Sequence, residues 1–252
     1  MLNIVSVGDP KNPTLIVAHG LFGSAKNWGV LCKRLSDKWY VIAVDMRNHG
    51  GSKFYPVHNY EAMAEDLQKI VKIQGVDCSI LGHSMGGKAA MFFALEQPKM
   101  VSKLIVIDIA PVKYSHSQNN IIEALQNINL EFVKSRKDAD VQLASFLGDH
   151  QLRAFLLQSL ELKDGVFWKL NLPVLKEYMR DIMGFPSTTK IFKGKTLLVV
   201  GENSNYVSSD DEVVMHKRFS EMKTVVISDA GHWLHAEKPK ELENTIRKFL
   251  AN

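Results

Sequence analysis

The sequence predicts an α/β fold with a mostly parallel central sheet flanked by helices, and with a helical cap inserted after the strand that ends at Asp108. Three observations lead to this prediction. Short, continuous apolar runs alternate with stretches of helical periodicity, which is typical of a parallel sheet covered on both faces. The alternation stops between residues 112 and 195, where helical patterns follow one another without a long strand. A Gly-x-Ser-x-Gly pentapeptide directly follows one of the apolar runs.

Six apolar runs are expected to form the sheet, because a strand buried on both faces is apolar throughout rather than alternating. They are Thr14–Ala18, Trp39–Val44, Cys78–Leu81, Leu104–Ile107, Thr196–Val200 and Thr224–Ile227. Helical patterns predict the elements between them, at Asn27–Leu35, Tyr60–Gln74, Lys88–Gln97, Asp210–Ser220 and Lys240–Leu250.

Residues 1–111 and 196–252 are expected to form the core, and residues 112–195 the cap. Ligands of such sheets bind at the carboxyl ends of the strands, so the cap is expected to cover the site. Four amphipathic patterns predict its helices, at Ile121–Ile128, Val141–Leu147, Leu152–Leu160 and Val174–Met183. Most of its large apolar residues are expected to pack the cap onto the core.

Composition excludes several classes of function. The chain has 252 residues, of which 46% are hydrophobic and 23% charged, as in an ordinary globular protein. Its net charge of +4 comes from intermixed charges without a basic block, which argues against a nucleic-acid partner. No apolar run approaches the span of a bilayer, so no membrane association is expected. Cys32 and Cys78 are expected to be buried or partly buried thiols, and the expected location is the cytoplasm.

The stretch from Val76 to Pro98 carries the candidate nucleophile, Ser84, within Gly82-His83-Ser84-Met85-Gly86. The pentapeptide alone is weak evidence, but a strand before it and a helix after it supply the context of a nucleophile elbow. A serine hydroxyl needs a base to take its proton and a third group to hold that base.

His232 is the candidate base, because it follows the last strand in a loop with a glycine beside it. His83 is interpreted as a structural neighbour, and His19 and His49 as hydrogen-bonded parts of loops. His235 lacks the glutamate of a zinc-binding helix, so no metal site is expected. The remaining histidines are interpreted as solvated surface; they are His58, His116, His150 and His216.

The candidate acid is Asp108, at the end of the strand next to the Ser84 strand. A lone carboxylate among apolar neighbours is costly unless it is paired. Asp210 and Asp211 resemble the first turn of a helix, where acidic residues are favoured, and Glu202 is a further alternative.

Backbone N–H groups for an oxyanion hole are expected from Leu21, in the loop His19–Gly23, and from Met85, with Phe22 as the alternative to Leu21. The turn-rich segment Asp45–Ser52 is expected to be a rigid, internally hydrogen-bonded loop.

These motifs, together with Ile107-Asp108-Ile109-Ala110-Pro111 and Gly231-His232-Trp233-x-His235, resemble the α/β-hydrolase superfamily. Within it the chain resembles the small bacterial esterase/thioesterase branch of the YbfF type, over nearly its whole length and least in the cap. The resemblance implies the α/β-hydrolase fold, an acid at Asp108, and activity on short acyl esters and acyl-CoA thioesters. Most α/β hydrolases carry the acid in the loop that is Gly201–Val207 here, which has no Asp at the expected place.

We therefore expect a serine hydrolase that cleaves carboxylic esters, with acyl-CoA thioesters as a further class, through an acyl-enzyme on Ser84 and without a cofactor. A C–C bond hydrolase or lyase of the same fold, and a catalytically slow ligand-binding receptor, are the alternatives. Five aromatic side chains are expected to bind the small-molecule substrate: Phe22, Phe155, Trp168, Tyr206 and Trp233.

Overall fold

The computed structural model describes residues 1–75 and 77–252, so Val76, where the predicted elbow stretch begins, lies outside the described residues. Seven strands form one sheet in the order β1-β3-β2-β4-β5-β8-β9. β1 is antiparallel to β3, and the other neighbours are parallel. The strands are β1 (Ile4–Val7), β2 (Thr14–Ala18), β3 (Tyr40–Val44), β4 (Cys78–His83), β5 (Val101–Ile107), β8 (Phe192–Gly201) and β9 (Phe219–Ile227). The predicted mostly parallel sheet is confirmed.

The sequence did not predict β1, and it predicted β8 and β9 shorter than they are. β1 is an antiparallel edge strand whose residues are exposed or half-buried, so it has no continuous apolar run. β8 starts at Phe192 instead of Thr196, and its first residues include the exposed Lys193 and Lys195. A search for strands buried on both faces cannot detect such segments.

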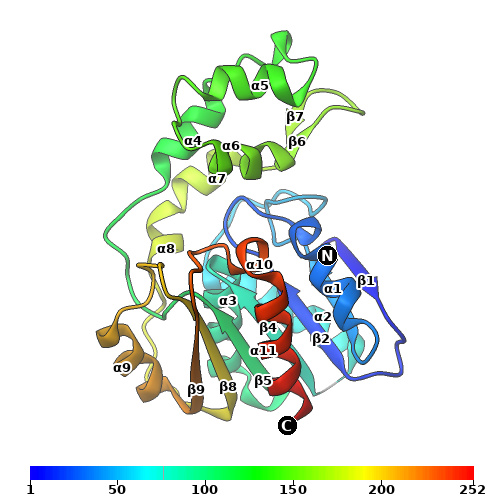
Figure 1. Cartoon of the computed structure of the whole chain (residues 1–252), viewed down its shortest axis with the longest axis vertical. Coiled ribbons are helices and arrows are strands. Elements are labelled where there is room, and N and C mark those ends of the chain that lie inside the picture. Colours follow the sequence, from blue (N-terminus) through cyan, green and yellow to red (C-terminus); the bar gives the residue numbers. More distant parts are fainter. Residues whose placement is uncertain (76) are drawn as a thin grey trace.

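Helices cover both faces of the sheet (Figure 1). One face packs against α1 (Gly29–Leu35), α10 (Leu234–Glu237) and α11 (Pro239–Ala251). The other packs against α2 (Tyr60–Gln74), α3 (Met85–Glu96) and α9 (Ser209–Arg218). Successive residues of a strand point to opposite faces, so Leu15 and Val17 of β2 join the first layer, while Ile16 and Ala18 join the second.

The segment between β5 and β8 forms a separate group of elements above the sheet in Figure 1. It contains α4 (Asn119–Gln126), α5 (Arg136–Leu143), α6 (His150–Leu156), α7 (Leu172–Glu177), α8 (Met179–Met183) and the short strands β6 (Leu160–Glu161) and β7 (Phe167–Trp168). We propose that this segment is a cap inserted into the core. None of the helices in the described part of the chain is both long and apolar enough to cross a bilayer.

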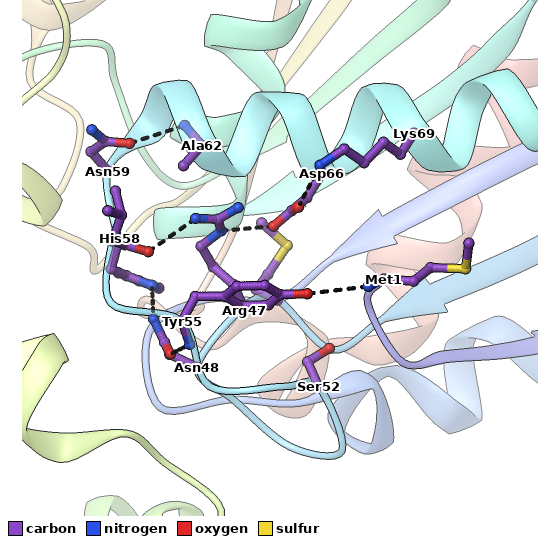
Figure 2. A network of polar contacts seen from close by, with 12 residues as sticks. Met1, Arg47, Asn48, Ser52, Tyr55, His58, Asn59, Ala62, Asp66 and Lys69 are labelled. Carbon is purple, nitrogen blue, oxygen red and sulfur yellow. Dashed lines mark hydrogen bonds and ion pairs between the residues drawn. The ribbon is translucent and has the colours of Figure 1, made fainter.

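The loop after β3 is held rigidly, as predicted. The Asp45 carboxylate accepts hydrogen bonds from the N–H groups of Ala25 and Gly51, each at 2.7 Å. Figure 2 shows the next part of this loop, where the Arg47 side chain reaches the Asp66 carboxylate of α2 at 2.7 Å. Arg47 and Asp66 are both buried, and burial makes such a paired contact costly to break. The loop therefore ties β3 to α2.

His58 is not on the surface as predicted; it is fully buried beside this loop. Its Nδ1 lies 3.2 Å from the Asn48 side-chain nitrogen (Figure 2). Burial lowers the pKa of His58 to about 3, so the imidazole is neutral at pH 7 and can accept this hydrogen bond. The residues before His58 show no regular strand or helix pattern, so the sequence carried no signal of its burial.

Candidate active site

Ser84 lies at a sharp turn between β4 and α3. Its backbone has φ 52° and ψ −121°, an unusual conformation for a residue with a side chain, of a kind found at functional sites. The two glycines of the pentapeptide permit this turn by close backbone approach. A Cβ atom on Gly82 would lie 2.3 Å from the Gly86 carbonyl oxygen, and one on Gly86 would lie 2.5 Å from the Ala18 carbonyl oxygen. The sequence context predicted for the elbow is therefore present.

The structure brings His232 to Asp108. The Nδ1 atom of His232 lies 2.6 Å from Oδ2 of Asp108, whose side chain is completely buried at the end of β5. The other carboxylate oxygen, Oδ1, accepts the Gly201 N–H at 3.1 Å. The Tyr206 ring stacks on the imidazole, with centroids 3.8 Å apart and planes 16° apart. These contacts fix the position and the plane of the His232 ring.

The alternative carboxylates are used elsewhere. Asp211 accepts hydrogen bonds from Ser208 in the capping box of α9, and Asp210 lies exposed in the first turn of the same helix. Glu202 accepts the Asp229 N–H at 2.9 Å. Of these four carboxylates, Asp108 is the one in hydrogen-bond contact with His232 in the described part of the chain.

Ser204 is a site residue that sequence reasoning missed. Its hydroxyl donates to Oδ2 of Asp108, the same oxygen that faces His232. The Ser204 oxygen in turn accepts the Tyr206 N–H at 3.2 Å. Ser204 belongs to the loop after β8, where most α/β hydrolases carry their acid. The lack of an Asp at the expected place in this serine-containing loop was the signal in the sequence.

Three further histidines hold the backbone around the site. His83 donates its Nε2–H to the carbonyl oxygen of His232 at 2.9 Å, and burial lowers its pKa well below 6.5, so that it stays neutral. His19 accepts the Met46 N–H at 2.9 Å through Nε2. The prediction that His83, His19 and His49 are structural agrees with these contacts and with those of His49 described next.

The contacts of the loop after β2 differ for the two oxyanion donors predicted there, Leu21 and Phe22. The Phe22 N–H donates to Nε2 of His49 at 3.1 Å, so it is already engaged. Leu21 and Met85 line the same cavity as Ser84 and His232. Phe22 lines this cavity as well, so the engagement of its N–H is what favours Leu21 as the partner of Met85.

The cavity beside Ser84 has a volume of about 90 Å³. Four of the five aromatic residues predicted to bind substrate line it, namely Phe22, Phe155, Tyr206 and Trp233. Trp168 is not among its lining residues. It is buried inside the cap instead, where its indole N–H donates to the Leu125 carbonyl oxygen at 3.0 Å. An apolar pattern does not distinguish an aromatic residue that packs the cap from one that faces a ligand.

Lys88 also lines the cavity and was not singled out as a site residue in the sequence. It lies one turn after Ser84 on α3 and is only 1% exposed. Its ammonium donates to the carbonyl oxygens of Val112 at 2.8 Å, Met183 at 3.0 Å and Gly184 at 2.7 Å. Val112 begins the segment between β5 and β8, and Met183 and Gly184 end its last helix. Lys88 therefore joins both ends of the proposed cap to the helix that follows Ser84.

The free energy of unfolding is expected to report the titration of Lys88. Burial lowers the pKa of its ammonium from the ordinary 10.5 to about 7. Between these values the unfolded chain holds the proton and the folded protein has lost it, so stability rises with pH by about 1.4 kcal/mol per unit. Lys88→Met removes this gain. Urea denaturation should show that wild type gains roughly 2–3 kcal/mol over the variant between about pH 7.5 and 9.5.

Lys217→Met is the matched control, because it removes an exposed lysine of α9 that is solvated in both states. Equal pH slopes for wild type and Lys88→Met would contradict the lowered pKa.

Comparison with known proteins places the chain in a family. A model of the alpha/beta hydrolase fold matches residues 13–239. The chain is 37% identical to the mouse protein named sn-1-specific diacylglycerol lipase ABHD11, across 97% of this chain and 83% of that protein. It is also 37% identical to esterase YbfF of Escherichia coli K12, across 95% and 93%. A solved structure entitled marine microorganism esterase superposes with a TM-score of 0.94 at 38% identity, covering 98% of each chain. The chain therefore belongs to the α/β-hydrolase family.

Proposed function

We propose that this protein is a serine hydrolase that cleaves carboxylic esters through an acyl-enzyme on Ser84. One observation carries the proposal: His232, held at 2.6 Å by the buried Asp108, lines the same cavity as a serine on a strained strand-to-helix turn. A nucleophile, a base and a group that orients the base are the parts that acyl transfer requires. The relatives named as an esterase and as a lipase support an ester substrate.

In the proposed reaction, the Ser84 hydroxyl attacks the acyl carbonyl carbon while Nε2 of His232 takes its proton. The N–H groups of Leu21 and Met85 stabilise the negative oxygen of the tetrahedral intermediate. His232 then gives the proton to the leaving alcohol, and the acyl group remains on Ser84. Water repeats the sequence, with His232 again as base, and releases the carboxylic acid.

Asp108 keeps the Nδ1 proton of His232 in place, so that Nε2 is free to accept a proton, and it stabilises the imidazolium that forms. Ser204 and Gly201 donate to Asp108 and orient it. A thioester carbonyl forms the same tetrahedral intermediate, so acyl-CoA thioesters are a further class within the proposal. The buried, unpaired thiols of Cys32 and Cys78 favour a reducing location, and we propose the cytoplasm.

The size of the cavity predicts a preference for short acyl groups. A volume of about 90 Å³ is well below the roughly 300–1,000 Å³ of sites for drug-sized ligands. We expect kcat/KM for p-nitrophenyl acetate and butyrate to exceed that for the laurate ester by about tenfold or more. A panel of p-nitrophenyl esters and acyl-CoA substrates, with spectrophotometric detection, measures this.

The panel also tests the proposed function itself. Hydrolysis of none of these substrates by folded protein would overturn the proposal and favour the ligand-binding alternative. Rates that rise steadily to the laurate ester would contradict the acyl-length prediction alone, because the chemistry at Ser84 would remain.

A further inference from the structure

We infer that a groove between α1, α6 and α10 binds the alcohol half of the ester substrate, and that this half is an apolar chain. The inference rests on the proposed function and adds the substrate class. The groove has a volume of about 740 Å³. Its apolar lining comes from both the core and the cap: Val30, Leu31, Ala154, Phe155, Trp233 and Pro239. Val30 of α1 is 65% exposed, so its apolar side chain is accessible to a ligand in the groove.

The groove lies directly against the catalytic cavity. Four residues line both spaces: Asn27, Phe155, Trp233 and His235. The rings of Phe155 from the cap and Trp233 from the core lie 5.9 Å apart, between centroids, where the two spaces meet. In the inferred binding mode, a substrate with its carbonyl at Ser84 extends past this aromatic pair into the groove.

The position of the groove selects the alcohol half rather than the acyl half. In the proposed reaction His232 protonates the leaving oxygen, so the alcohol must depart beside the His232 ring. Trp233 is the residue directly after His232, and His235, Ala236 and Glu237 of the following α10 also line the groove. The far end of the catalytic cavity, near Tyr60 and Met183, lies on α2 and α8 instead and is left for the acyl group.

The two volumes support the same division. The catalytic cavity holds about 90 Å³, and the groove about 740 Å³. A small acyl group and a larger alcohol fit this arrangement, whereas a long acyl chain with a small alcohol would leave the groove unused.

The charges at the groove favour an apolar alcohol over an anionic one. Arg34 is paired with Glu243 at 3.2 Å. The Glu237 carboxylate, also at the groove, accepts the N–H groups of Gly231 at 2.6 Å and Trp233 at 3.1 Å. The charge of Arg34 is thus offset by Glu243, and Lys26 shares the lining of the groove with the Glu237 carboxylate. A phosphate-bearing leaving group would share the groove with the negative charge of Glu237.

The test uses acetate esters of straight-chain alcohols from ethanol to octanol, with acetate release measured for the whole chain. Each methylene buried in the groove should raise kcat/KM by about two- to fourfold. Val30→Glu places a charge on the α1 wall, and Ala154→Glu places one on the opposite α6 wall. Each should lower the ratio of octyl to ethyl acetate kcat/KM by about tenfold or more. Val213→Glu, at a 53% exposed valine of α9, is the matched control and should leave the ratio unchanged.

The outcomes separate this inference from the proposed function. Equal kcat/KM values for all the acetate esters, with ethyl acetate still hydrolysed in a Ser84-dependent reaction, would overturn the inference about the groove. The proposed esterase function would stand. A kcat/KM that exceeds the ethyl acetate value for acetyl-CoA alone, and that loses this excess in Lys26→Glu, also overturns the apolar assignment. It would favour an anionic leaving group. Failure to hydrolyse any ester, together with no fluorophosphonate labelling of Ser84, overturns both proposals.

Discussion

Replacing Ser84 with alanine is expected to lower kcat/KM for p-nitrophenyl acetate by about four powers of ten or more. The proposed acyl-enzyme forms on the Ser84 hydroxyl, and alanine leaves His232 without a nucleophile to activate. The residual rate should come from the oxyanion donors and substrate binding alone. Alanine also has a Cβ atom, so the backbone strain at φ 52° is the same in the variant as in wild type. The fold is therefore expected to persist. Steady-state kinetics and circular dichroism measure the two effects.

A fluorophosphonate probe gives the same prediction an independent measurement. Wild type should be labelled on the peptide that contains Ser84, and Ser84→Ala should not be labelled. Ser102→Ala is the matched control, because Ser102 is exposed near the start of β5 and pairs with Ser79 at 3.1 Å. Folded wild type that resists the probe would favour a receptor over an enzyme. A variant lacking the hydroxyl but retaining full activity would place the nucleophile elsewhere.

The sequence predicts best the elements whose local pattern is unambiguous. β2 and α2 have the predicted bounds, because Thr14–Ala18 is a continuous apolar run and Tyr60–Gln74 has clear helical periodicity. The Asn59 side chain caps α2 by accepting the Ala62 N–H, which fixes its start. Edge strand β1 carries no such signal, because its side chains face solvent or a loop rather than two helical layers.

The sequence predicts those site residues whose position is set by the strand and loop that carry them. Ser84 and His232 follow strands in loops rich in glycine, so their place at one edge of the sheet follows from topology. Ser204 and Lys88 were missed because their roles depend on contacts made across the fold, to Asp108 and to both ends of the cap. Trp168 shows the reverse case, since its residue type indicated a ligand contact that the folding of the cap does not provide.

Asp108→Asn is expected to lower kcat by roughly three to four powers of ten, a loss similar to that seen in other enzymes with this triad. The Gly201 N–H requires an acceptor, so the amide oxygen of asparagine takes the place of Oδ1. The amide NH₂ then takes the place of Oδ2 and donates to Nδ1 of His232. That contact puts the imidazole proton on Nε2, where it blocks transfer from Ser84. Because the size of the side chain is unchanged, circular dichroism should show an intact fold.

Asp210→Asn is the matched control for this substitution. Asp210 is exposed in the first turn of α9, where its charge interacts weakly with the helix dipole, so kcat should stay within about twofold of wild type. Kinetics of both variants on p-nitrophenyl acetate decide the assignment of the acid. A severe loss in Asp210→Asn with a mild one in Asp108→Asn would show that His232 draws its orienting carboxylate from the first turn of α9. The 2.6 Å contact to β5 would then be structural, and Ser204 would lose its proposed part in the reaction.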